Sequence, residues 1–87
     1  MLSIGYAASF VRRFKKLDTS LQQEIKERIE EFKDLSNHSA LRVHKLSGRM
    51  RGKSAFSVNF CDRIIFEWSK DKKTAYLLDV GDHGIYE

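Results

Sequence analysis

Three side chains in the second half of this sequence have the chemistry needed to act on a phosphodiester bond. Arg63 opens one alternating stretch, and His83 and Tyr86 follow the end of the next. Cleaving RNA through its own 2′-hydroxyl needs a base, an acid for the leaving oxygen, and cations for charge on the phosphate. A guanidinium can hold two phosphate oxygens, and an imidazole titrates near neutral pH. These residues predict phosphodiester chemistry on RNA if the fold brings them together.

Other polar residues could assist. Glu67 falls on the same strand face as Arg63, where it is either a candidate general base or an ion-pair partner across the sheet. A connection without acidic residues, 44–53, contains four cations that could bind RNA backbone or an acidic protein, or could simply be solvated. They are Lys45, Arg49, Arg51 and Lys53.

Length and composition limit the class of protein. The chain has 87 residues, 41% hydrophobic content and a formal net charge of +4, which predicts one domain over 1–87 and favours polyanionic or acidic partners. The single cysteine excludes an internal disulfide, and no spacing fits a zinc site or a nucleotide fingerprint, so we expect no metal and no cofactor. Without a bilayer-length apolar run or a secretory signal pattern, we expect a cytoplasmic protein.

The elements that must position these residues can be derived from periodicity. Residues 2–6 predict a strand, and 7–17 predict a helix with a basic outer side. A second helix carries an apolar stripe and opens with a capping box of Thr19 with Gln22 or Ser20 with Gln23. Alternation over 56–60, 63–68 and 75–80 predicts a three-stranded meander. The stripe consists of Leu21, Ile25, Ile29, Phe32 and Leu35.

The resulting order, β-α-α-β-β-β, describes an α+β domain with a helical hairpin on one face of an antiparallel sheet. With this order, the chain resembles the RelE/ParE toxin superfamily of bacterial toxin–antitoxin systems. Four motifs carry the resemblance at the proper spacing. They are Lys45-Leu46-Ser47-Gly48, Phe56-Ser57-Val58-Asn59-Phe60, Arg63-Ile64-Ile65-Phe66 and Val80-Gly81-Asp82-His83-Gly84-Ile85-Tyr86.

The resemblance implies a toxin neutralised by a cognate antitoxin. RelE-like members are endoribonucleases (mRNA interferases) that inhibit translation, commonly at the ribosome, and their site residues match Arg63, His83 and Tyr86. Nuclease members often have lysine or histidine pointing into the site where this chain has Ser57. We expect Ser57 to contact the RNA there, which leaves His83 or Glu67 as the base. Two alternatives therefore stay open: a ParE-like inhibitor of DNA gyrase, and an inactive relative that only binds its antitoxin or RNA.

Overall fold

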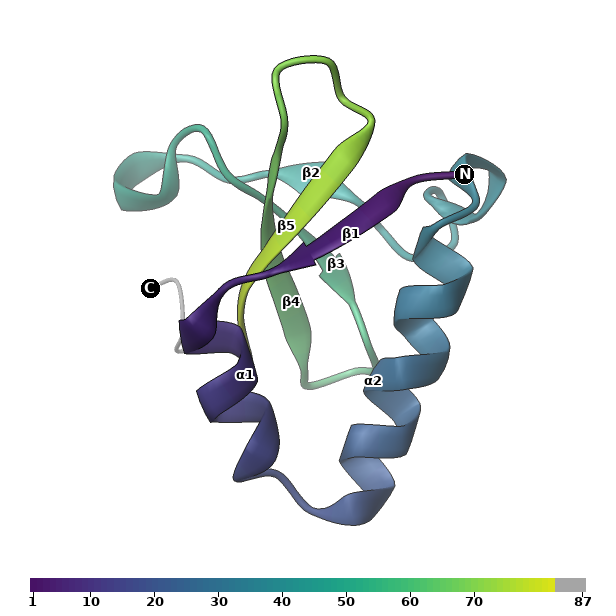
Figure 1. The fold of residues 1–87 in the computed structure, drawn as a ribbon, viewed down its shortest axis with the longest axis vertical. Coiled ribbons are helices and arrows are strands. Elements are labelled where there is room, and N and C mark those ends of the chain that lie inside the picture. The colour runs from purple at the N-terminus through teal and green to yellow at the C-terminus, as the bar shows by residue number, and fades with distance from the viewer. Residues whose placement is uncertain (83–87) are drawn as a thin grey trace.

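The structure is a computed structural model that describes residues 1–82. It confirms the predicted α+β class, with each predicted helix and strand present and one two-residue strand added. The elements, drawn in Figure 1, are β1 Ser3–Tyr6, α1 Ala8–Lys15, α2 Thr19–Phe32, η1 Leu35–Asn37, β2 His44–Lys45, η2 Gly48–Met50, β3 Ser54–Ser57, β4 Arg63–Trp68 and β5 Thr74–Gly81. No helix within residues 1–82 is long and apolar enough to cross a membrane.

The five strands form one mixed sheet in the order β1-β5-β4-β3-β2. β3, β4 and β5 make the predicted antiparallel meander. β1 instead pairs in parallel with β5, with Ser3 opposite Thr74 and Tyr6 opposite Leu77. The expected antiparallel sheet therefore holds for β2 to β5 and is wrong for β1. Parallel pairing places the N-terminal strand beside the last one, so the sequence that follows β1 must cross back over one sheet face.

The helices cover that face, and the other face is only partly exposed, since Ala55 and Ile65 on it are buried. Ile25 and Phe32 of α2 are fully buried against Phe56, Ile64 and Leu77 of the sheet. α1 adds Phe10 to the same core. Since side chains alternate along a strand, Arg63, Ile65 and Glu67 of β4 lie on the opposite face.

The start of α2 differs from the predicted capping box. Asp18 is the N-cap, and its carboxylate accepts a hydrogen bond of 2.8 Å from the Leu21 N–H. Aspartate satisfies one of the free N–H groups of the first turn as well as serine or threonine would. Leu35 was also misplaced, because α2 ends at Phe32 and Leu35 is 63% exposed in η1.

Two strand assignments change as well. β3 ends at Ser57, so Phe60 belongs to the turn and is 98% exposed instead of facing the core. On β5, a register shift leaves Leu78 as an extra residue, since Phe66 pairs with Leu77 whereas Ile65 pairs with Asp79. Such a bulge reverses the alternation of the strand. The core face of β5 is therefore Ala75, Leu77 and Val80, whereas uninterrupted alternation would place Tyr76 and Leu78 on the same face as Val80.

Candidate phosphate-binding site

The turn between β3 and β4 positions Arg63. Within it, the Asn59 carboxamide oxygen accepts hydrogen bonds of 2.8 Å from the N–H groups of Cys61 and Asp62. The Val58 N–H in turn donates to the Asp62 carbonyl at 2.9 Å. Asparagine favours turns because its side chain replaces a backbone acceptor in this way. The turn is thus closed by its own hydrogen bonds immediately before Arg63.

Helix α2 holds this turn against the domain. The Arg28 Nε donates to the Val58 carbonyl at 3.1 Å, and its Nη1 donates to Glu31 at 2.7 Å. The Asn59 Nδ2 also donates to Glu24 at 2.7 Å. Arg28 and Glu24 therefore connect the helical layer to the end of the sheet where Arg63 begins.

Arg63 lies directly beside Ser57 on β3 and Gly81 on β5. Its Nη1 donates one long hydrogen bond of 3.5 Å to the Cys61 carbonyl. Within residues 1–82, the ion pairs involve Arg13, Arg28 and Lys33 but not Arg63. Its guanidinium is therefore available to an anion, and pairing with Asp62 or Glu67 is not observed.

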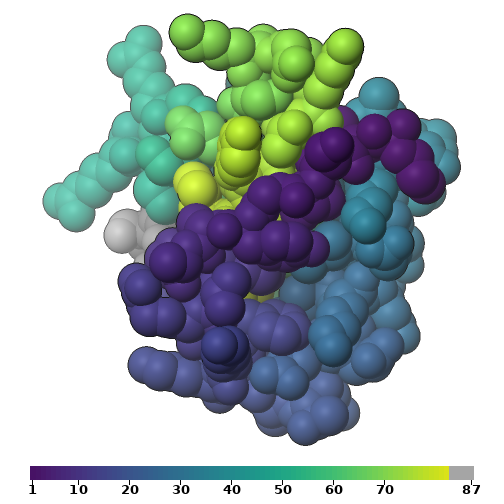
Figure 2. Space-filling model, viewed as in Figure 1, coloured from purple at the N-terminus to yellow at the C-terminus, as the bar shows by residue number. Residues whose placement is uncertain are grey.

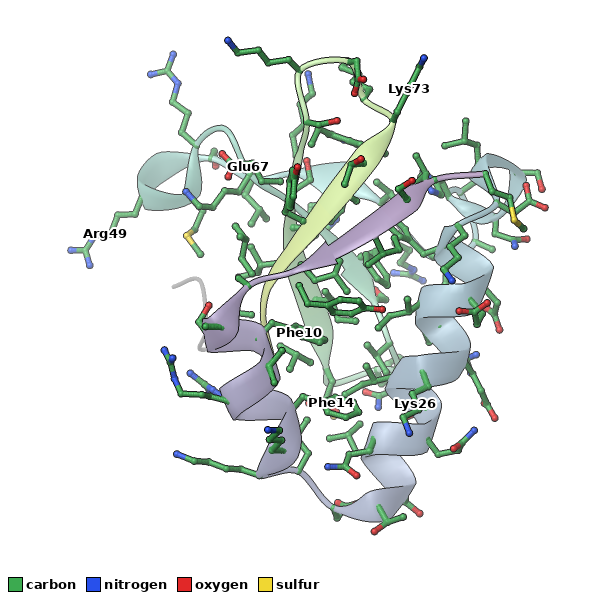
Figure 3. All side chains as sticks on the ribbon, in the orientation of Figure 1. Phe10, Phe14, Lys26, Arg49, Glu67 and Lys73 are labelled. Atoms are coloured by element: carbon green, nitrogen blue, oxygen red, sulfur yellow. The ribbon has the colours of Figure 1, made fainter. Side chains whose placement is uncertain are left out.

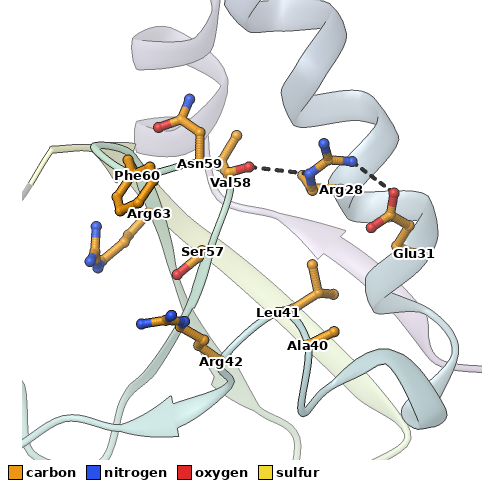
Figure 4. A pocket seen from close by; sticks show the side chains of 10 residues that line it. All are labelled: Arg28, Glu31, Ala40, Leu41, Arg42, Ser57, Val58, Asn59, Phe60 and Arg63. Atoms are coloured by element: carbon orange, nitrogen blue, oxygen red, sulfur yellow. Dashed lines mark hydrogen bonds and ion pairs between the residues drawn. The ribbon is translucent and has the colours of Figure 1, made fainter.

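A second arginine joins Arg63 in one pocket. Arg42 comes from the segment before β2. This segment lies along β3, because the Ser57 N–H donates to the Leu41 carbonyl at 2.8 Å. Arg42, Ser57 and Arg63 line a hollow of about 310 Å³, and Figure 4 shows Ser57 between the two arginine side chains. Arg28 and Glu31 line the side toward α2. Paired guanidinium groups of this kind suit phosphate.

Arg42 is a functional candidate that the sequence did not reveal. Its backbone has φ of 57°, a left-handed conformation that costs an ordinary residue about 1–2 kcal/mol. Three hydrogen bonds hold this turn, including Arg42 N–H to Ser39 at 3.1 Å and Val43 N–H to His38 at 3.1 Å. Non-glycine residues held in this conformation concentrate at functional sites. No periodicity in the sequence signals it.

Of the other predicted catalytic residues, the structure describes Glu67 alone, and Glu67 does not line this pocket. Glu67 shares the Arg63 face, but it is exposed four residues further along β4, at about 13 Å. Its role as a base stays a prediction. His83 and Tyr86 lie outside the described residues. β5 ends at Gly81, the partner of Arg63 in the sheet, and Asp82 follows as the last described residue.

The basic connection surrounds the opposite end of the sheet from Arg63. Lys45 is exposed in β2, and Arg49 and Arg51 are exposed in and after η2. Lys53 is half-buried just before Ser54, whose partner is Phe66. In Figure 2 side chains of this connection (teal) project from the body of the molecule. Ser57 lies apart from this connection and lines the arginine pocket, and its contact with RNA stays a prediction.

The remaining titratable side chains serve structure or face solvent. The His38 ring stacks on Phe32 with centroids 4.7 Å apart, and its Nε2 lies 2.8 Å from the Phe32 carbonyl oxygen. His44 is exposed, and so is Cys61 in the turn. Among residues 1–82, no group of three or more His, Cys, Asp or Glu side chains is arranged to hold a metal ion.

Comparison with known proteins finds relatives in fold. No family model matches the sequence, and no curated protein matches it. Solved structures do match. YafQ from Escherichia coli has a TM-score of 0.77 at 15% identity, covering 98% of this chain and 97% of its own. A chain of the RelBE2 toxin–antitoxin complex of Mycobacterium tuberculosis has a TM-score of 0.75 at 17% identity, covering 94% of this chain and 98% of its own. A chain of the RelE–RelB complex of Pyrococcus horikoshii has a TM-score of 0.73 at 15% identity, covering 95% of this chain and 96% of its own.

These similarities identify the fold of the chain. Two helices on one face of a five-stranded mixed sheet are the fold of RelE-like toxins, as the resemblance in sequence motifs predicted. The likeness spans nearly the whole chain and nearly the whole of each matched structure. Sequence identity of 15–17% identifies the fold and does not by itself transfer an activity.

Proposed function

We propose that this chain is the toxin of a toxin–antitoxin pair and that it cleaves mRNA without a metal ion, so that translation is inhibited. One observation carries the proposal: Arg42 and Arg63 line the same hollow on either side of Ser57, and neither forms an ion pair with residues 1–82. Unpaired guanidinium groups that converge on one hollow favour an anionic ligand. A phosphodiester is the anion that suits a basic domain with this fold.

In the proposed reaction, the 2′-oxygen of one nucleotide attacks the adjacent phosphorus. The phosphorus–O2′ bond forms as the phosphorus–O5′ bond breaks, which leaves a cyclic phosphate and a free 5′-hydroxyl. Negative charge grows on the non-bridging oxygens, where Arg42 and Arg63 stabilise it. His83 exchanges the protons of the attacking and leaving oxygens, and Tyr86 contacts the RNA; both roles come from the sequence resemblance.

Variants in a cell-free translation reaction test this function, with 5′ ends of the mRNA mapped. Arg63→Ala should slow cleavage by about a hundredfold or more, because it removes transition-state charge stabilisation. Arg12→Ala is the matched control, since Arg12 is an exposed arginine on α1 away from the pocket. Wild-type cleavage by both Arg63→Ala and His83→Ala would refute the site.

A non-catalytic toxin is the second candidate, and the pocket lining favours it in one respect. Among the pocket-lining residues within 1–82, the only carboxylate is Glu31, which is paired with Arg28, and there is no lysine or histidine. A YoeB/ParE toxin from Agrobacterium tumefaciens shares the fold, with a TM-score of 0.74 at 14% identity and coverage of 94% and 99%. Inhibition of DNA gyrase supercoiling by purified protein, without mRNA cleavage, would support this alternative.

The proposed antitoxin has a suitable surface in the helical layer. A groove of about 390 Å³ between α1 and α2 is lined by apolar side chains together with Lys15 and Lys26. Figure 3 shows Phe10 and Phe14 pointing from α1 toward α2. We propose that an acidic, amphipathic segment of the antitoxin binds here. Lys26→Glu should weaken neutralisation by the antitoxin while leaving mRNA cleavage unchanged, as measured by growth rescue and by cleavage in vitro.

A further inference from the structure

Tyr76 has an exposed aromatic ring that packs against the backbone of a glycine on the neighbouring strand. Tyr76 lies on β5, opposite Gly5 of β1, and is 47% exposed. A Cβ added to Gly5 would lie 2.5 Å from Cδ1 and 2.8 Å from Cε1 of the ring. The ring therefore rests on the glycine backbone. This packing leaves ring surface exposed on the sheet face away from the helices, the face that also carries Arg63.

Charged groups adjoin this ring. Glu67 is the partner of Tyr76 on β4, is exposed, and forms no ion pair with any residue among 1–82. Lys53 comes just before Ser54, the β3 partner of Phe66. Extending this pairing by one residue places Lys53 beside Glu67 on β4. Lys53, the Glu67 carboxylate and the Tyr76 ring together make a polar site with a stacking surface.

We infer that Tyr76 and Glu67 form a subsite for one base of the RNA, a role that rests on the proposed cleavage function. A base stacks on the exposed ring of Tyr76, as single-stranded bases do on aromatic side chains. The Glu67 carboxylate accepts a hydrogen bond from an amino or imino group on that base, as acidic side chains do from cytosine N4. Lys53 binds the neighbouring phosphate.

The position of the subsite decides which nucleotide it reads. Glu67 and Tyr76 lie about 13 Å along the sheet from Arg63, beyond the reach of a base attached to the phosphate held there. The base at Tyr76 therefore belongs to a nucleotide flanking the cleaved bond. In this subsite the Glu67 carboxylate selects the base, and the general-base role predicted from the sequence is not used. This subsite sets the base preference at one flanking position.

Cleavage of an mRNA with a randomised window tests the subsite, with cut sites mapped for each variant. Tyr76→Leu should lower cleavage about tenfold and flatten the preference at one flanking position, whereas Tyr76→Phe should keep both because it keeps the ring. Glu67→Gln should change which base is preferred there, because the amide adds a hydrogen-bond donor where the carboxylate only accepts. Gly5→Ala should imitate Tyr76→Leu by displacing the ring. Circular dichroism melting checks that each variant folds.

A non-cleavable, fully 2′-O-methylated RNA oligonucleotide separates this inference from the proposed function, with binding followed by fluorescence polarisation. Weaker binding by Tyr76→Leu, at least fivefold, supports the subsite even if cleavage is slow. If wild type cleaves and Arg63→Ala does not, but all Tyr76 variants keep the wild-type preference and affinity, the subsite is refuted and the function stands. Tyr76→Leu losing only antitoxin binding would also refute it. Failure of wild type to bind or cleave RNA would refute both.

Discussion

Glu24 on α2 and Asn59 in the β3–β4 turn are joined by a hydrogen bond of 2.7 Å. The same carboxamide accepts two backbone N–H groups of the turn through its oxygen, so one side chain both closes the turn and ties it to the helix. Arg63 begins β4 immediately after Asp62. The helical layer therefore fixes the approach of the candidate phosphate-binding arginine.

Asn59→Ala should destabilise the domain by about 1–3 kcal/mol, because the turn loses hydrogen bonds and leaves half-buried groups unpaired. Cleavage should also fall, since Arg63 is no longer held in place. Urea unfolding and end-mapped cleavage measure the two effects. Gln23→Ala is the control, because Gln23 is an exposed residue of α2 next to Glu24. It should alter neither stability nor cleavage. Wild-type unfolding and cleavage by Asn59→Ala would show that the turn is held otherwise.

Arg42→Gly should separate function from stability. Glycine adopts the left-handed conformation of this position without steric cost, so the free energy of unfolding should stay within about 1 kcal/mol of wild type. Removal of the guanidinium should nevertheless weaken RNA binding about tenfold. Arg42→Lys retains the charge and should bind better than Arg42→Gly. Equal RNA affinity for wild type and Arg42→Gly would remove Arg42 from the site.

Phe32→Ala should be the most damaging single change in the core, at about 3–5 kcal/mol. The Phe32 ring is fully buried, stacks on Phe56 at 4.2 Å between centroids and meets Phe66 edge-on at 4.9 Å. Its loss leaves a cavity at the junction of α2 with the sheet. Thermal and urea unfolding measure the effect. Phe32→Leu fills most of that space and should cost less; equal losses for the two variants would contradict the cavity explanation.

Salt dependence should report contacts between the basic connection and RNA. Each cation that neutralises a phosphate of single-stranded RNA contributes about 0.7 to the slope of log K against log salt concentration. Arg49→Ala and Arg51→Ala should each reduce the magnitude of the slope by about that amount, whereas Arg12→Ala should not. Titrations of a 2′-O-methylated oligonucleotide at several salt concentrations provide the slopes. An unchanged slope for both variants would identify the connection as solvated surface.

Acid should remove a contribution of the β4–β5 turn to the stability of the fold. Hydrogen bonds from the Ser69 hydroxyl and then the Lys73 N–H lower the pKa of Asp71 from its ordinary 3.8. Because the folded pKa lies below the unfolded one, the stabilisation is present above about pH 4 and is lost as pH falls through the folded pKa. Asp71→Asn should therefore lower Tm at neutral pH and converge with wild type near pH 2. A constant Tm difference would contradict this origin.

Local patterns were sufficient to predict most elements and the face on which Arg63 lies. Strict alternation placed Ile64 and Phe66 in the core and put Arg63 with Glu67 on the other face, as observed. Helical spacing identified the buried positions Ile25, Ile29 and Phe32. The patterns failed where tertiary packing overrides local period. A bulge at Leu78 reverses the alternation of β5, and the turn after Ser57 takes Phe60 out of the sheet.

The sequence alone determined a basic α+β domain with an arginine at the head of a strand, because periodicity and residue chemistry are local properties. Tertiary structure alone decided that β1 pairs in parallel with β5, that Gly5 supports the Tyr76 ring, and that Arg42 joins Arg63. Each of these relationships depends on contacts between distant segments. Arg42 is brought to the pocket by the hydrogen bond from the Ser57 N–H to the Leu41 carbonyl. Nearly every residue carries these backbone groups, so residue types do not predict the bond.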